Sequence, residues 1–187
     1  HELGHHMYHS SDDFKTCHMR ARRDNLASLW NIVLDEHLER NLRAVDREYG
    51  DQLKKLNAYA FQHKPREFAV RHLLSMLGPY AFDVLTQCDL LPARTSGCVL
   101  IPAGVVLKEL ENLGSSFARF FRALLMGLGN RTNDPKVAAG LALFDNAFRQ
   151  SSAENLYTIT RRLREIFGDE ADMLKQLGSD ALITYGE

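Results

Sequence analysis

The chain opens with His-Glu-Leu-Gly-His, and this pentapeptide constrains the fold more than any other feature of the 187-residue sequence. On an α-helix, residues four positions apart lie about 40° from each other around the axis and roughly 6 Å apart along it. His1 and His5 can therefore close on one metal ion, with the carboxylate of Glu2 beside the open position of that ion. A water molecule there acquires a general base. The pattern predicts an initial helix that carries a Zn²⁺ site.

The position of this motif indicates that the sequence is a piece of a longer protein. His1 is not an initiator Met, and a helix that binds a catalytic metal normally follows a strand or another helix. We therefore expect preceding residues to exist and to form part of a substrate cleft, with the edge of a sheet as the natural candidate.

Composition is that of an ordinary globular protein, with 45% hydrophobic and 25% charged residues. The net charge of −1 argues against a general nucleic-acid-binding surface. No apolar run approaches eighteen residues, so we expect no membrane-spanning helix. The three cysteines include no C-x-x-C pair, which argues against a disulfide framework and against a thiolate zinc site. A reducing cytoplasm fits these observations best.

Hydrophobic spacing and helix-end residues predict a mainly α fold, a multi-helix zincin-like domain fragment. After the first helix and a loop over residues 10–23, a long helix is expected over 24–49, with Gly50 as its stop. One irregular stretch near 90–102 is expected to contain a loop or a short strand at 98–101. The other expected helices cover residues 51–63, 65–77, 79–88, 103–128, 134–149, 151–168 and 169–177.

We divide the chain at residue 63. Residues 1–63 would form the metal-binding helical core, truncated at its N-terminus, and residues 64–187 a helical extension packed on it, unless the two make one continuous domain. The apolar residues between 117 and 126 favour a helical core over a docking surface for a partner.

A catalytic zinc site needs a third protein ligand. The metzincin arrangement would require Gly and His where this chain has Tyr8 and Ser11. His9 lies one turn beyond His5, but it would be about 12 Å along the axis from His1, too far for all three histidines to share an ion. We therefore interpret His9 as a surface residue or as a neighbour of the ligands.

A carboxylate from the long helix is the remaining route, because Asn31, Asp35 and Glu39 recur every four residues beside its apolar stripe. Neighbouring acids at this spacing repel each other. One carboxylate on the metal, with the other accepting an N–H from a metal-bound histidine, would remove the conflict. The competing interpretation is an ordinary solvated helix with the acid-before-base pairs Glu36–Arg40 and Glu39–Arg43. The zinc half-site just upstream favours the ligand interpretation.

Residues 1–5 together with 29–39 resemble the metallopeptidase-like, gluzincin-type domains found with von Willebrand factor A domains, a group that includes the cobaltochelatase accessory subunit and related bacterial proteins. In that group a helix with the pattern N-x-x-[ED]-D-x-R-x-E follows the zinc helix. Asn31, Asp35 and Glu39 match its Asn, Asp and final Glu, whereas Leu34 and His37 replace its first acid and its Arg. The resemblance is specific over residues 1–45 and weaker beyond.

This resemblance implies a cytoplasmic bacterial protein with a peptide or protein substrate. It also implies a metal-ion-dependent adhesion fold, of the von Willebrand factor A type, in a C-terminal part beyond this sequence, and an AAA+ ATPase as partner. Asp35 is then the expected third ligand, with Glu39 orienting His1 or His5 and Asn31 supporting the contact between the helices. Two further interpretations stay open: a zinc-stabilised interaction module without catalysis, and a metal-chelatase subunit.

Overall fold

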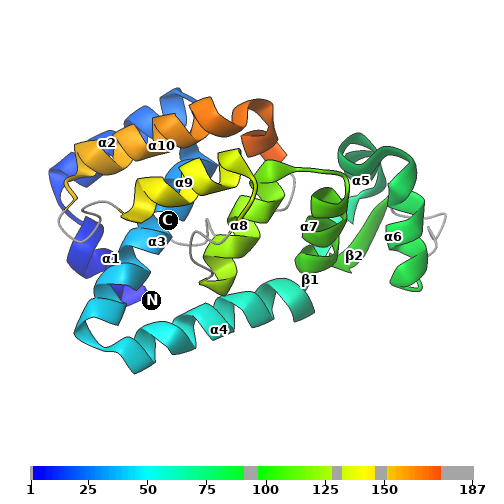
Figure 1. Cartoon of the computed structure of the whole chain (residues 1–187), viewed down its shortest axis with the longest axis horizontal. Coiled ribbons are helices and arrows are strands. Elements are labelled where there is room, and N and C mark those ends of the chain that lie inside the picture. Colours follow the sequence, from blue (N-terminus) through cyan, green and yellow to red (C-terminus); the bar gives the residue numbers. More distant parts are fainter. Residues whose placement is uncertain (1, 91–96, 128–131, 146–150, 174–187) are drawn as a thin grey trace.

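A computed structural model of the chain describes residues 2–90, 97–127, 132–145 and 151–173, with Glu2 described by its backbone alone (Figure 1). Within this part the fold is mainly α, as predicted, and its strands form one two-stranded antiparallel sheet. None of the described helices combines the length and the apolar composition that crossing a bilayer requires.

The first two helices lie at one end of the molecule (Figure 1). α1 (Glu2–His9) matches the expected helix, but α2 (Asp12–Arg23) occupies the segment predicted as a loop, and that prediction is wrong. The apolar pattern does not reveal α2 because few of its residues are hydrophobic. Its ends carry acids in the first turn and three arginines in the last, which suit the helix dipole, and its buried face packs against α3 and α10.

The long helix predicted over residues 24–49 is shorter than expected. α3 (Ala27–Val45) ends where Asp46 adopts an extended conformation and caps α4 (Arg47–His63), accepting a hydrogen bond from the Tyr49 N–H at 3.1 Å. Gly50 is therefore inside a helix and not a stop. A Cβ at Gly50 would lie 2.6 Å from the Cβ of Arg43, so this glycine permits the close approach of α3 and α4.

The sheet replaces part of a predicted helix. β1 (Pro65–Ala69) pairs with β2 (Cys98–Pro102), so the helix expected from residue 65 begins only as α5 (Val70–Leu77), whereas the short strand expected at 98–101 is confirmed. The partner strand is some thirty residues away, outside the reach of any local pattern. A 3₁₀ turn (Gly78–Tyr80) and α6 (Ala81–Gln87) follow; residues 91–96 lie outside the described part.

The helix predicted over residues 103–128 is in fact two. α7 (Ala103–Asn112) and α8 (Ser116–Met126) are separated at Gly114, which has a φ of 91° that favours glycine. The Ser115 hydroxyl then accepts a hydrogen bond from the Ala118 N–H at 3.1 Å and starts α8. A glycine and a capping serine between two apolar stretches thus break a pattern that appears continuous in the sequence.

α9 and α10 begin within two residues of the starts predicted at 134 and 151. Asp134 caps α9 (Pro135–Asp145), and its Oδ1 accepts from the Lys136 N–H at 2.9 Å. Ser152 caps α10 (Ala153–Phe167), which ends at Gly168. The helix expected over 169–177 begins as a 3₁₀ turn (Gly168–Asp172), and the rest of it falls outside the described residues, as do the predicted helix residues 146–149.

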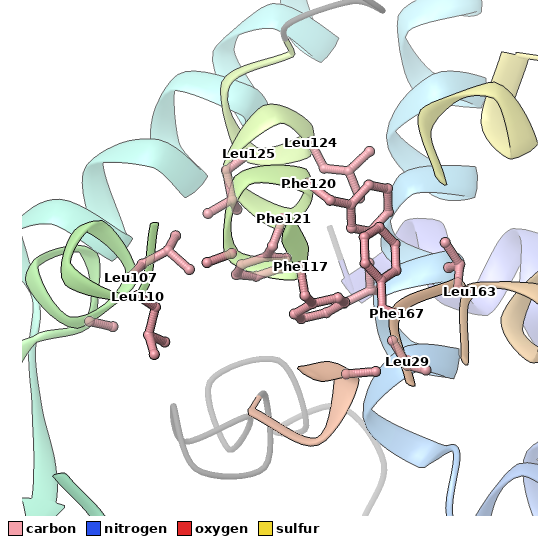
Figure 2. Close-up of a cluster of buried hydrophobic side chains, with 14 of the residues drawn as sticks. Leu29, Leu107, Leu110, Phe117, Phe120, Phe121, Leu124, Leu125, Leu163 and Phe167 are labelled. Atoms are coloured by element: carbon pink, nitrogen blue, oxygen red, sulfur yellow. The ribbon is translucent and has the colours of Figure 1, made fainter. Parts of the chain in front are cut away.

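The centre of the apolar core is the meeting point of α8 and α10 (Figure 2). The rings of Phe120 and Phe167 have centroids 4.8 Å apart. The core interpretation of residues 117–125 is confirmed, since the large apolar side chains there are buried, while Met126 is 44% exposed. The cluster continues from α2 and α3 through β1 to α10 and includes side chains from both sides of residue 63. Figure 2 labels Leu29, Leu107, Leu110, Phe117, Phe120, Phe121, Leu124, Leu125, Leu163 and Phe167.

Candidate metal site between α1 and α3

Gly4, the fourth residue of the opening motif, determines how closely α1 approaches α3. Gly4 is buried, and a Cβ at this position would lie 2.5 Å from Cδ1 of Leu38. A larger residue would displace α1 or force Leu38 to move. The motif therefore contributes a close helix contact, and this contact brings the histidine face of α1 to α3.

His5 and Asp35 meet across this contact. His5 Nε2 lies 3.0 Å from Asp35 Oδ1, and their side chains are only 18% and 16% exposed. Burial raises the pKa of the Asp35 carboxyl above its usual range, while the hydrogen bond with His5 opposes that rise. Two donors at the usual distance of about 2.0–2.1 Å from a tetrahedral zinc ion are themselves about 3.3 Å apart. The imidazole and the carboxylate thus have nearly the spacing that a shared ion requires.

His1 and Glu2 are the two other predicted site residues of the opening motif. His1 and the side chain of Glu2 lie outside what the structure describes. Among the described residues, no three His, Cys, Asp or Glu side chains form a group arranged to hold a metal. A complete ligand set at this position therefore depends on His1. The set His1, His5 and Asp35 has the nitrogen and oxygen donors of a catalytic zinc site, so the donor chemistry fits Zn²⁺.

Two further histidines extend the site in a chain. His5 Nδ1 lies 2.9 Å from His9 Nδ1, and His9 Nε2 lies 2.9 Å from His37 Nδ1. If Asp35 is ionised, the His5 Nε2–H donates to it, which leaves His5 Nδ1 as an acceptor in the neutral ring. His9 then donates from Nδ1 and accepts at Nε2 from the Nδ1–H of His37. One set of tautomers satisfies these three contacts.

Both added histidines are neutral at pH 7. Burial, followed by the neighbouring His5 and His37, lowers the pKa of His9 to about 3. Burial also lowers the pKa of His37 to about 4. The sequence predicts His9 as a surface residue or a neighbour of the ligands, and it indicates no role for His37 beyond a departure from the family pattern. The spacing of His9 from His5 was the available signal, whereas the contact with His37 depends on how α1 crosses α3.

Glu39 and Asn31 occupy different surroundings from Asp35. The Glu39 carboxylate faces α4, where its Oε2 lies 2.8 Å from Lys54 Nζ and its Oε1 accepts a hydrogen bond from Asn57. Its role in orienting His1 or His5 stays a prediction. Asn31 is half-buried, one turn before Asp35 on α3.

A buried ion-pair cluster lies behind the site. Lys54 Nζ is 2.6 Å from Glu36 Oε2 and also donates to the Leu124 carbonyl at 2.8 Å. Glu36 pairs in addition with Arg40 at 2.7 Å, as the spacing predicted. Burial would lower the pKa of Lys54, but the charges of Glu36 and Glu39 outweigh it and raise that pKa.

The solvated-helix interpretation of these acids is wrong, because Glu36 and Glu39 are 5% and 1% exposed. The predicted partner of Glu39, Arg43, instead pairs with Asp51 at 3.3 Å. Neither the burial nor the role of Lys54 could be predicted from spacing along one helix, since Lys54 comes from the second arm of the α3–α4 hairpin.

Comparison of the chain with protein-family models, with curated proteins and with solved structures gives no significant match. The function is therefore inferred from the residues and the geometry of the α1–α3 site.

Proposed function

We propose that the protein is a zinc-dependent metallopeptidase-like domain in which His1, His5 and Asp35 hold Zn²⁺. The observation that supports this proposal is the 3.0 Å separation of His5 Nε2 and Asp35 Oδ1, which join two helices far apart in the sequence. His5 belongs to a motif that pairs it with His1 one turn earlier and places Glu2 beside the first histidine. The Asp35 side chain is 16% exposed, so it is largely but not fully removed from solvent.

In amide hydrolysis, the ligands would bind the metal and Glu2 would transfer the proton. A bound Zn²⁺ supplies Lewis-acid polarisation of the amide carbonyl and activation of a water molecule. The Glu2 carboxylate accepts the proton of that water and then passes it to the leaving nitrogen. His9 accepts or donates at Nδ1 and so fixes the ring of His5. Glu39 stays an expected orienting residue for His1, and Asn31 an expected support of the helix contact.

The sequence resemblance extends the proposal to the cellular setting. It supports a peptide or protein substrate, a bacterial cytoplasmic location, a von Willebrand factor A domain elsewhere in the protein and an AAA+ ATPase partner. These assignments depend on the residues 1–5 and 29–39 that carry the resemblance.

Hydrolysis can be tested with fluorophore-labelled, denatured casein as the probe. We expect the zinc-loaded protein to cleave it, and Glu2→Gln to reduce the rate by about 10²–10⁴-fold while zinc stays bound at the wild-type stoichiometry. His5→Ala should lose both zinc and activity. His6→Ala is the matched control, since His6 is the exposed neighbour on the same helix, and it should keep both. Equal rates for Glu2→Gln and the wild type would overturn the catalytic role.

A second function, a zinc-stabilised interaction module in a von Willebrand factor A, AAA+ or chelatase-type assembly, is favoured by one observation. The chain of contacts from His5 through His9 to His37 joins α1 to α3 by polar side chains, so a metal there would fasten the two helices. In that case zinc would raise the melting temperature of the wild type and of Glu2→Gln equally, and neither would cleave casein.

A further inference from the structure

Three histidines of α1 and α3 form a chain in which each ring contacts the next through one nitrogen. His5 Nδ1 lies 2.9 Å from His9 Nδ1, and His9 Nε2 lies 2.9 Å from His37 Nδ1. At the other end of the chain, His5 Nε2 lies 3.0 Å from Asp35 Oδ1. Both nitrogens of His5 and of His9 are therefore engaged, so the position of the proton on one ring constrains its position on the next.

The rings of His9 and His37 are neutral at pH 7, because burial lowers their pKa values to about 3 and about 4. A neutral imidazole carries one N–H donor and one acceptor nitrogen, whereas an imidazolium carries two donors. Two N–H groups that face each other at 2.9 Å make no hydrogen bond, and neither do two bare nitrogens. Each contact therefore allows only one arrangement once the tautomer of the neighbouring ring is set.

The arrangement without metal is set by Asp35. With its carboxylate ionised, the protons lie on Nε2 of His5, on Nδ1 of His9 and on Nδ1 of His37. A neutral histidine that binds Zn²⁺ through Nε2 has no proton on that nitrogen and carries it on Nδ1 instead. The Nδ1–H of His5 would then face the Nδ1–H of His9. Their hydrogen bond can persist only if His9 changes its tautomer as well.

We propose that His9 and His37 are positioning residues whose tautomers switch when His5 binds Zn²⁺. His5 Nε2 is a metal ligand in the proposed function, on which this inference rests. One proton moves from His9 Nδ1 to His5 Nδ1, and a second moves from His37 Nδ1 to His9 Nε2. His5 Nε2 releases one proton to water and His37 Nε2 takes one up from water, so every ring stays neutral and the number of protons is unchanged. His37 thus responds to the metal although only His5 of the three is a ligand.

The switch gives His5 a hydrogen-bond partner both with and without the metal. Without zinc, the His9 Nδ1–H donates to His5; with zinc, the His5 Nδ1–H donates to His9. A carboxylate, which is a common partner of zinc-bound histidines, can only accept when it is ionised. A neutral histidine at position 9 therefore holds the ligand ring in place before the metal binds, and this preorganisation strengthens zinc binding.

Nitrogen chemical shifts of the imidazole rings test the switch, because they distinguish a protonated ring nitrogen from a bare one. The whole chain, labelled with ¹⁵N, is measured at pH 7 in EDTA and again, after removal of the EDTA, with one equivalent of zinc chloride. We expect zinc to move the proton from Nδ1 to Nε2 in both His9 and His37, and from Nε2 to Nδ1 in His5. His72, an exposed histidine on α5, should not change.

A variant that interrupts the chain separates a switch from a general effect of zinc on the fold. His9→Phe keeps a ring at this position but removes both nitrogens. Zinc should then still change the tautomer of His5 but not that of His37, and zinc binding measured by calorimetry should weaken about tenfold or more. His6→Phe, at the exposed neighbour on α1, is the matched control and should keep the switch and the wild-type affinity.

The spectra also separate failure of the switch from failure of the zinc site. A zinc-dependent change at His5 without one at His9 and His37 would overturn the inference and leave the zinc site standing. The same holds if all three rings already have the zinc-bound tautomers in EDTA, since Asp35 would then carry the proton. No change at His5 would overturn the proposed function and the switch together. The wild-type spectra decide among these outcomes even if His9→Phe is unstable.

Discussion

The α8–α10 core and the α1–α3 interface are built from opposite kinds of side chain. In the core, Phe117, Phe120 and Phe167 are no more than 2% exposed and contact one another by their rings. At the interface, polar side chains meet in pairs, and the large apolar residues Leu3 and Met7 of α1 face outward, 73% and 70% exposed. Apolar burial is non-directional and does not depend on protonation. The α1 contacts are hydrogen bonds, which depend on both protonation and geometry. The stability of the α1–α3 interface therefore depends on pH and on side-chain geometry, whereas that of the α8–α10 core does not.

The largest expected effect is in the core. Phe120→Ala should lower the free energy of unfolding by about 3–5 kcal/mol, because it removes a fully buried ring and leaves a cavity. Urea denaturation followed by circular dichroism measures this change. Phe82→Ala, at a 60% exposed phenylalanine, should change stability by less than about 1 kcal/mol. Equal effects at the two positions would remove the distinction between core and surface.

The ion-pair cluster should come next. Lys54→Met should destabilise the fold by roughly 3 kcal/mol at pH 7, because Glu36 and Glu39 then stay buried without their cation. The loss should shrink as the pH falls, since burial raises the pKa of Glu39 and removal of the Lys54 charge raises it further. Lys55→Met, at the exposed neighbour on α4, is the control and should be nearly neutral. A loss that is independent of pH would argue against unpaired acids as its cause.

Acid should loosen the interface before the core. An unfolded imidazole titrates near 6.5, whereas the folded pKa values of His9 and His37 are about 3 and about 4. Between these limits the unfolded form binds more protons, so the stabilisation is complete above pH about 6.5 and is lost as the pH falls toward 4. We expect metal-free protein to lose stability over this pH range.

Hydrogen exchange over this pH range shows where the loss occurs. Amides of α1 should lose protection first, while those of α8 keep theirs. The His9→Gln, His37→Gln double variant should have a flatter pH dependence above pH 4. Uniform loss of protection in α1 and α8 would contradict the separate behaviour of the interface.

The smallest expected effect concerns the fit of α1 itself. Gly4→Ala should cost about 1 kcal/mol, because the new methyl group lies within 2.5 Å of a flexible Leu38 methyl that can shift only partly. Met7→Ala, on the exposed side of the same helix, should cost less. Thermal unfolding of both variants measures the difference, and a more stable Gly4→Ala would show that α1 does not depend on the close contact.

Local signals predicted much of the fold, and long-range contacts explain what they missed. The starts of α9 and α10 were predicted to within two residues, because a helix start depends on a few neighbouring residues. β1 was missed because Phe68 pairs with Val99, and α2 because its helix is stabilised by charge and by contacts with α10. At the site, the four-residue spacing on α3 predicted Asp35. The contacts from His9 to His37 and from Glu39 to Lys54 were not predicted, because each depends on how two helices cross, which no local sequence pattern indicates.

The central claim is that α1 and α3 together form a zinc site, and isothermal titration with Zn²⁺ tests it most directly. We expect one ion per chain for the wild type and for His6→Ala, and a loss of binding of about tenfold or more in both His5→Ala and Asp35→Asn. A shared loss would link the two helices through one ion. Wild-type affinity in both His5→Ala and Asp35→Asn, or no zinc binding by the wild type, would contradict the account.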